Sequence, residues 1–226
     1  MLKALVFDMD GTITKLTLPL EAMRQDTKNF YIEHGFPAEL FEDADGISSS
    51  TAKAKEYFLS NGMQLSEWEQ MEGEVDRILS QHEGFAAANA VLIEGTLDIV
   101  NQIRRSGLFT AILTNNGRFA VDKIMQQLPL VKYFDIIQTR HESPQPKPYP
   151  DGLLKLAMLF GINPNEMVYV GDALIDVTAA KRAGIEFWGV ATGETPAHVL
   201  REAGASIVFY SLDGVLHEVR NRGMKQ

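Results

Sequence analysis

The chain of 226 residues contains no cysteine. Disulfides, thiolate-bound metals and cysteine nucleophiles are therefore excluded from any explanation of its function. The sequence also lacks an apolar run near the ~20 residues that a membrane-spanning helix needs, and no basic-then-apolar signal sequence opens it. We therefore expect a cytoplasmic protein.

The chain also has fewer basic than acidic residues. Lys and Arg number 21 against 30 Asp and Glu, which gives a formal net charge of -9. Nucleic acids and anionic membranes are themselves negatively charged, so we expect neither as the main partner. The apolar content of 45% is ordinary for a globular protein. This length allows one large domain, or one domain with a substantial insertion.

The most informative segment lies near the N-terminus, where an apolar run leads directly into Asp8, Asp10, Gly11 and Thr12. Side chains two apart on an extended strand point the same way, so both carboxylates face the region beyond the strand end. Gly11 permits a sharp turn close to a ligand, and Thr12 offers a hydroxyl and a backbone N–H. Taken alone, this pattern is as consistent with a simple Asp-Gly turn as with a reactive site.

Three later segments repeat this arrangement. Thr114 and Asn115 follow one apolar run, Asp172 and Asp176 follow another, and Lys147 stands among prolines between them. Each has an ordinary explanation: a helix N-cap for Thr114, a solvated surface lysine, or acidic residues in the first turn of a helix. The complete ordered set is a stronger signal than its parts, and it indicates one shared site.

In this order the four segments resemble the signature motifs of the haloacid dehalogenase-like (HAD) hydrolase superfamily. Residues 147–151 and 179–184 resemble its phosphoglycolate phosphatase and beta-phosphoglucomutase-like branch. Two departures are visible: Ala173 stands where many relatives have Ser, and no acidic residue follows shortly after Thr12. The resemblance spans nearly the whole chain. It implies a Mg²⁺-dependent phosphatase that hydrolyses a small phosphorylated metabolite, phosphoglycolate-like or sugar-phosphate-like, through an aspartyl-phosphate.

The resemblance also implies roles for individual residues. Asp8 would be the nucleophile, and Asp10 would be the general acid and base. A carboxylate that approaches an anionic phosphate is repelled by several kcal/mol at an effective dielectric near ~20, so cations must offset the repulsion. Catalysis would also use Thr114 and Lys147. The implied phosphoryl-binding residues are Thr12, Thr114, Asn115 and Lys147. The implied Mg²⁺ ligands are Asp8, the backbone carbonyl of Asp10, and Asp172. Asp176 would not bind the metal itself but would orient a metal-bound water.

Strands and helices alternate from residue 93 onward, which predicts a parallel, doubly wound α/β core of Rossmann-like type. Residues 15–92 instead show helical periodicity and predict an inserted all-helical cap domain, which leaves 1–14 and 93–226 as the catalytic core. The expected helices of this insertion cover 19–34, 51–60, 66–79 and 85–90, and its expected core contains Trp68, Met71, Val75, Ile78 and Leu79.

Substrate choice would rest with the cap, where Arg24, Lys28, Lys53 and Lys55 are candidates to meet a polar or anionic leaving group. A phosphomutase on the same scaffold is an alternative, and so is a phosphonate hydrolase in which Lys53 or Lys55 forms a Schiff base. A dehalogenase is disfavoured because carbon–halogen displacement does not need the acid/base group of Asp10. The alternative from another class is a non-catalytic metabolite-binding or scaffold protein. The sequence does not indicate an oligomeric state.

Overall fold

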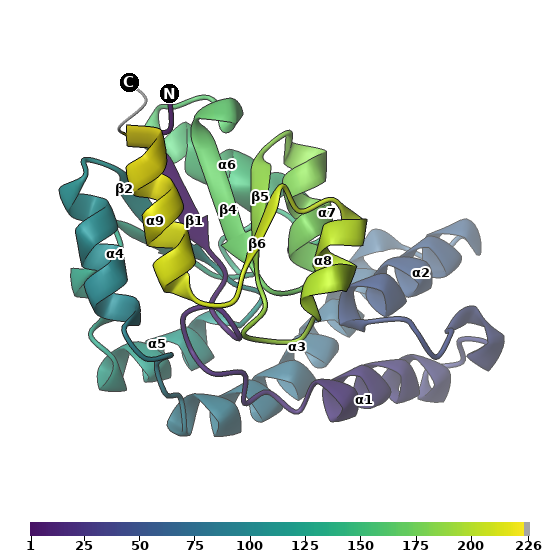
Figure 1. The fold of residues 1–226 in the computed structure, drawn as a ribbon. Helices are drawn as coiled ribbons and strands as arrows, with labels where there is room; N and C mark the ends of the chain where they lie inside the picture. Colours follow the sequence, from purple (N-terminus) through teal and green to yellow (C-terminus); the bar gives the residue numbers. More distant parts are fainter. Residues whose placement is uncertain (224–226) are drawn as a thin grey trace. The chain divides into compact units, whose positions relative to one another are not determined.

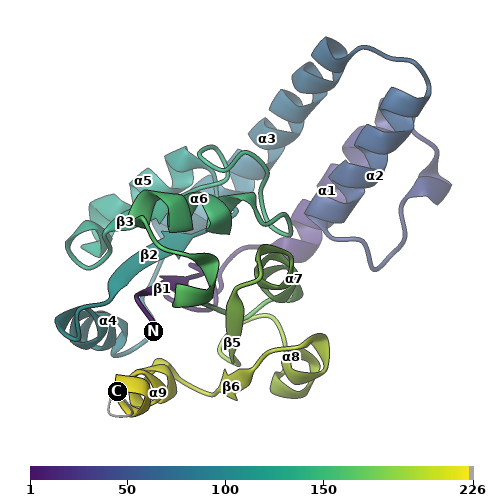
Figure 2. The same ribbon diagram turned by 90° about the horizontal axis from the view of Figure 1, so that it is seen from above.

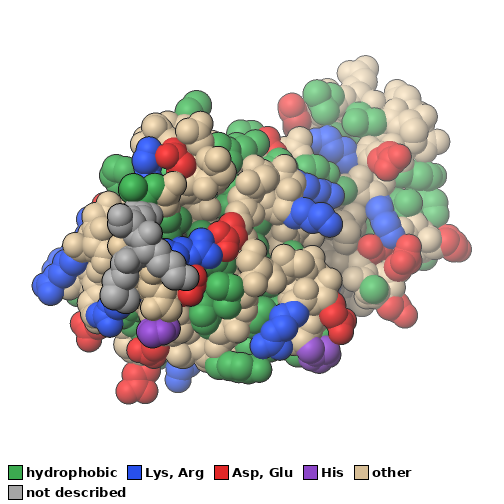
Figure 3. Space-filling view, turned by 45° about the horizontal axis from the view of Figure 1, so that its top comes forward, with side chains coloured by type: hydrophobic (Ala, Val, Ile, Leu, Met, Phe, Trp, Pro, Cys, Tyr) green, Lys and Arg blue, Asp and Glu red, His purple; other side chains and the backbone are tan. Residues whose placement is uncertain are grey.

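The computed structural model describes residues 1–223. The described residues fold as two compact units: residues 1–17 together with residues 89–223, and Leu18–Ala88. Within the described part of the chain, no helix combines the length and the apolar composition that crossing a membrane would require. On the face drawn in Figure 3, acidic and basic side chains are mixed.

The first unit is built on a six-stranded, wholly parallel sheet with the order β3-β2-β1-β4-β5-β6 (Figure 1). All four residues of β1 are buried, as expected for a central parallel strand covered on both faces. Phe7 pairs with Ile112 of β2 and with Val170 of β4, so the three strands end at one level. The strands are β1 (Ala4–Phe7), β2 (Phe109–Leu113), β3 (Ile136–Gln138), β4 (Met167–Gly171), β5 (Glu186–Val190) and β6 (Ile207–Phe209).

Helices cover both faces of this sheet. In Figure 2, α4 and α9 lie together on one side, and α7 and α8 lie on the other. This arrangement confirms the doubly wound α/β fold and the alternation of helices and strands that was predicted from residue 93 onward. The helices of this unit are α4 (Thr96–Arg105), α5 (Arg118–Gln127), α6 (Asp151–Phe160), α7 (Leu174–Ala183), α8 (Ala197–Ala203) and α9 (Leu212–Gly223), with short 3₁₀ turns at Leu130–Lys132 and Pro164–Glu166.

The second unit is helical and has its own hydrophobic core. Its helices are α1 (Leu20–Glu33), α2 (Ile47–Ser60) and α3 (Leu65–Ala88), with a 3₁₀ turn at Ala38–Leu40. Trp68 is fully buried and stacks on Tyr31 with ring centroids 5.9 Å apart. Val75 and Leu79 are buried in the same cluster, against which Met71 and Ile78 pack. The predicted core of the insertion is therefore confirmed.

Two boundaries in this unit were predicted incorrectly. The separate helices expected at 66–79 and 85–90 are one continuous helix, α3, which runs through Gly84. A single glycine costs a helix only about 1 kcal/mol, so it does not end a helix whose apolar face continues past it. Helix α2 begins at Ile47, four residues before the expected Thr51.

The basic residues proposed for substrate contact make local bonds in this unit. Lys53 Nζ lies 2.7 Å from Asp45 Oδ2 and 3.0 Å from Glu42 Oε1. Lys28 donates to the backbone carbonyl of Glu42 at 2.7 Å. Further ion pairs join Arg24 to Glu21 and Lys55 to Glu72.

Candidate active site

The predicted motif residues lie at the carboxyl ends of neighbouring strands. Asp8 follows β1 and Asp172 follows β4, and these strands are paired. Thr114 follows β2, and Lys147 lies in the loop between β3 and α6. With the strand order 3-2-1-4-5-6, the direction of winding reverses between β1 and β4, which is where ligands bind in open α/β sheets. Motif residues that are far apart in the sequence are thus brought to the same edge of the sheet.

Lys147 is at the centre of this arrangement. Its ammonium lies 2.6 Å from Asp8 Oδ1 and 2.7 Å from Asp176 Oδ1, and only 3% of the residue is exposed. It also donates to the Tyr169 hydroxyl at 2.9 Å, and that hydroxyl donates in turn to Asp176 at 2.8 Å. The ammonium therefore contacts three oxygen atoms, which belong to the residue after β1, to β4 and to α7.

Tyr169 is a site residue that the sequence reading missed. It lies within the apolar run of β4, where a tyrosine is read as core. Burial raises the pKa of Tyr169 well above the usual tyrosine value, and the nearby charge of Asp176 raises it further. The phenol therefore keeps its proton and can donate to a carboxylate.

The charges of the site do not balance. Asp8, Asp172 and Asp176 are all buried, and three carboxylates with the single ammonium of Lys147 leave a formal charge of -2. Burial raises the pKa of Asp8 well above its ordinary value, although Lys147 opposes the shift. Burial, followed by the charge of Asp176, raises the pKa of Asp172 to about 7. Burial lowers the pKa of Lys147, but Asp176 and Asp8 outweigh it, so the net shift is upward.

A divalent cation fits this charge and these donors. Oxygen atoms of the three buried carboxylates lie within 4.8 Å of one another. Hard oxygen ligands of this kind suit Mg²⁺ and related ions. The sequence predicted that Asp176 acts behind the metal ligands. In the structure, Asp176 lies as close to Asp8 and Asp172 as a ligand would, and it is also paired with Lys147.

The carboxylate of Asp172 is held tightly in place. It accepts hydrogen bonds from Thr12 Oγ1 at 3.1 Å and from the backbone N–H of Glu194 at 2.6 Å. Gly11 and Gly193 approach it so closely that a Cβ at either position would collide with the carboxylate. The loop after β5 is a second feature that the sequence reading missed, because it contributes through backbone atoms.

The two asparagines after β2 have different partners. The Asn115 side chain makes two hydrogen bonds to the backbone of Lys147. Its Nδ2 donates to the Lys147 carbonyl at 2.8 Å, and its Oδ1 accepts from the Lys147 N–H at 3.0 Å. Asn116, which the sequence reading did not select, donates from Nδ2 to Asp10 Oδ2 at 2.6 Å. Thr114 is buried, and its Oγ1 accepts from the N–H of Asn116 at 3.1 Å. The phosphoryl contacts expected of Thr12, Thr114 and Asn115 stay predictions.

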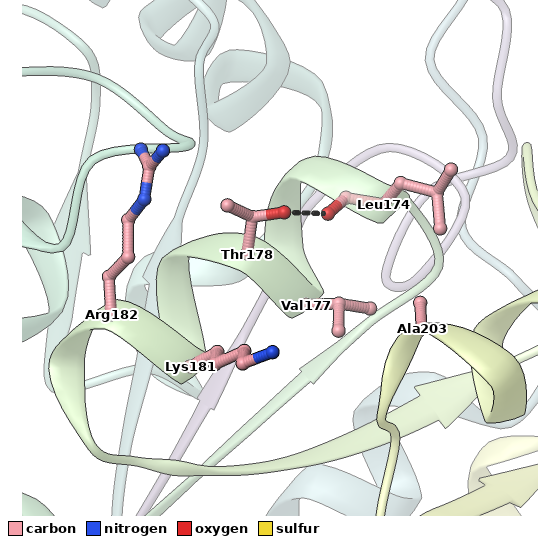
Figure 4. Close-up of a pocket in the computed structure, with 6 residues that line it drawn as sticks. All are labelled: Leu174, Val177, Thr178, Lys181, Arg182 and Ala203. Carbon is pink, nitrogen blue, oxygen red and sulfur yellow. Dashed lines mark hydrogen bonds between the residues drawn. The ribbon is translucent and has the colours of Figure 1, made fainter.

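Apart from this cluster of side chains, a surface hollow lies between α7 and α8. It encloses about 550 Å³ and is lined by Leu174, Val177, Thr178, Lys181, Arg182 and Ala203 (Figure 4). Its lining contains two cations and no carboxylate, and the Thr178 hydroxyl is directed to the Leu174 carbonyl. The acidic groups and Lys147 converge at the strand ends instead, so those ends are the candidate active site.

The metal-free protein is expected to lose stability as pH rises from 5 to 7. The folded-state pKa of Asp172 is about 7 and lies above its ordinary value of 3.8. The stability that this proton contributes is therefore fully present below pH ~4, and it is lost as pH rises through the folded-state pKa. From pH 5 to pH 7, the free energy of unfolding of the wild type should fall by on the order of 2 kcal/mol more than that of Asp172→Asn. Urea unfolding of both proteins in chelator would measure it, and parallel pH profiles would contradict the assignment.

Comparison with known proteins identifies the family. The sequence matches the profile described as "haloacid dehalogenase-like hydrolase" over residues 2–184, and the chain therefore belongs to the haloacid dehalogenase-like hydrolases. It is 25% identical over 227 residues to a phosphoglycolate phosphatase of Pseudomonas putida, with 95% of this chain and 78% of the relative covered. A phosphoglycolate phosphatase of Salmonella typhi is 28% identical over 131 residues, with 58% of this chain covered.

That second alignment spans about half of the Salmonella protein, namely 52% of its length. Among solved structures, a hydrolase from Pseudomonas syringae superposes with a TM-score of 0.67 at 20% identity, with 97% of this chain and 98% of that chain covered. This superposition shows the same fold. Hydrolases of this family generally use Mg²⁺, and the acidic cluster described above could hold such an ion.

Proposed function

We propose that this protein is a Mg²⁺-dependent phosphatase that hydrolyses a small phosphorylated metabolite through an aspartyl-phosphate on Asp8. One observation carries the proposal: three buried carboxylates cluster at the winding reversal of the sheet, and two of them share a single buried ammonium. Such a cluster lacks two positive charges, which a divalent cation supplies. The named relatives are phosphoglycolate phosphatases and support phosphoglycolate as the substrate. A sugar phosphate is the second candidate, because the sequence motifs also resemble the beta-phosphoglucomutase-like branch.

The proposed chemistry uses two carboxylates, Asp8 and Asp10. Asp8 Oδ2 attacks phosphorus, the bond from phosphorus to the ester oxygen breaks, and Asp10 gives its proton to the leaving oxygen. Water then attacks the acyl phosphate, Asp10 takes a proton from that water, and Asp8 is regenerated with release of inorganic phosphate. Lys147 holds Asp8 Oδ1 in place and offsets negative charge as the phosphoryl group approaches. Asp8, Asp172 and the backbone carbonyl of Asp10 would hold Mg²⁺, which would offset the negative charge of the phosphoryl oxygens.

We assign the cap role to residues 15–92, and the separate hydrophobic core of Leu18–Ala88 supports this. A phosphonate hydrolase is less well supported. Its Schiff base needs a neutral lysine, and the hydrogen bonds that Lys53 donates to Asp45 and Glu42 raise the pKa of Lys53. A phosphomutase remains the main alternative, since it would use the same nucleophile and return the phosphoryl group to a sugar. A non-catalytic binding protein would have no need for the complete set of reactive side chains.

The test is phosphate release from 4-nitrophenyl phosphate, phosphoglycolate and a series of sugar phosphates, with and without Mg²⁺. We expect turnover only with the metal, and inorganic phosphate as the product. An isomerised sugar phosphate would indicate the mutase. No turnover of any ester by the Mg²⁺-loaded protein would favour the binding protein.

Removal of the metal is expected to affect stability as well as activity. Mg²⁺ at 100 times its dissociation constant should stabilise the folded state by about 2.7 kcal/mol, which raises the melting temperature by roughly 5 °C or more. Thermal unfolding in EDTA and in Mg²⁺ measures this shift, and Asp172→Asn should abolish it. Full activity in EDTA together with an unchanged melting temperature would contradict the proposal.

A further inference from the structure

Asp10 is held by a residue outside the recognised motif positions. Asn116 Nδ2 lies 2.6 Å from Asp10 Oδ2, and Thr14 Oγ1 lies 3.3 Å from Asp10 Oδ1. Thr14 Oγ1 also lies 3.1 Å from the Met9 carbonyl oxygen, and its single proton serves only one of these two acceptors, so the shorter bond from Asn116 is the firmer restraint on the carboxylate. Asp10 itself is half-buried, in the turn that follows β1. A hydrogen bond of 2.6 Å to one carboxylate oxygen restricts rotation of the side chain about χ1 and χ2.

The donor is itself fixed. Asn116 is only 5% exposed. Its N–H is bound by Thr114 Oγ1 at 3.1 Å, and its carbonyl accepts from the N–H of Arg140 at 3.2 Å. The amide therefore projects from a backbone anchored on both sides. A rigid donor of this kind can fix the direction in which the Asp10 carboxylate faces.

We propose that Asn116 is a positioning residue, which orients the Asp10 carboxylate for proton transfer to the leaving oxygen and from the attacking water. This inference rests on the proposed phosphatase function and assigns a role to one further residue in it. Proton transfer needs the acid within hydrogen-bond reach of the reacting oxygen, and a displacement of about 1 Å can lower the rate about 10²-fold. Asn115 is the natural comparison because it bonds to Lys147 and not to Asp10.

The test compares two esters that differ in their need for an acid. Nitrophenolate leaves 4-nitrophenyl phosphate without a proton, whereas the alkoxide of glycerol 2-phosphate must be protonated. Steady-state kcat/KM reports the first displacement for both esters. We expect Asn116→Ala to lower kcat/KM about 10²-fold for glycerol 2-phosphate and less than about threefold for 4-nitrophenyl phosphate. Asn115→Ala, which acts through Lys147, should lower both by the same factor.

Asn116→Asp provides a second variant, because the carboxylate has the shape of the amide but cannot donate when ionised. It should show the same dependence on the leaving group, while far-ultraviolet circular dichroism confirms the fold. In an Asp10→Asn background, Asn116→Ala should leave the ratio of the two kcat/KM values unchanged.

The outcomes separate this inference from the proposed function. An equal loss on both esters in Asn116→Ala and Asn116→Asp would mean that Asn116 supports only the fold, and would overturn the inference while leaving the phosphatase intact. A further change of the ratio in the Asp10→Asn background would also overturn it. Failure of the Mg²⁺-loaded wild type to hydrolyse either ester, or any other phosphate, would refute the function and the inference together.

Discussion

Asp8→Asn should abolish turnover without unfolding the protein. The amide cannot attack phosphorus, and loss of a nucleophile in a well-studied hydrolase lowers kcat by about 10⁶-fold, so we expect a fall of at least about 10⁴-fold. Stability should be retained, because burial already raises the pKa of Asp8 and a neutral amide avoids that desolvation. Lys147 keeps its ion pair with Asp176 in the variant. Phosphate release and urea unfolding measure the two effects.

Labelling separates this role from that of Asp10. With ³²P-labelled substrate, wild type should form a transient acid-stable, base-labile phosphoprotein, and Asp8→Asn should form none. Asp10→Asn is the matched control, since it retains the nucleophile but lacks the base for hydrolysis of the intermediate. It should accumulate label from a substrate with a good leaving group. Label on Asp8→Asn, or residual turnover near the wild-type rate, would show that another group attacks.

Much of this site could be predicted because parallel strands end at one edge of the sheet. Asp8, Thr114 and Asp172 each come directly after an apolar run, so the alternation of strands and helices is sufficient to bring them together. The regular fold was predictable for the same reason. Lys147 is less constrained, because the loop that carries it has no periodic pattern. Only its position among the motifs indicated a role.

The features that were missed have physical causes in common. Tyr169 lies in an apolar strand, where its hydroxyl leaves no signal in the pattern. Glu194 acts on Asp172 through a backbone N–H, which every non-proline residue possesses. The bond from Asn116 to Asp10 joins positions 106 residues apart, and only the folded sheet brings them together. The break wrongly predicted within α3 arose because a local breaker, Gly84, was given more weight than packing.

Lys147→Ala should cost both activity and stability, in contrast to Asp8→Asn. Removing the ammonium leaves Asp8 and Asp176 buried without their shared cation, and breaking a buried pair in this way typically costs about 3–5 kcal/mol. The nucleophile also loses the group that holds its Oδ1, so kcat should fall about 10³-fold or more. Lys147→Met keeps the apolar stem and should lose the same activity, which separates charge from packing.

Lys181→Ala is the matched control, because Lys181 is exposed on α7 and lines only the outer hollow (Figure 4). Its removal should change stability by no more than about 0.5 kcal/mol and leave turnover unchanged. In Lys147→Ala, Mg²⁺ should restore part of the lost stability, since a divalent cation can offset the same carboxylates, but it should not restore the rate. Equal stability of Lys147→Ala and Lys181→Ala in chelator would mean that the buried carboxylates do not depend on this ammonium, and the charge argument for the site would fail.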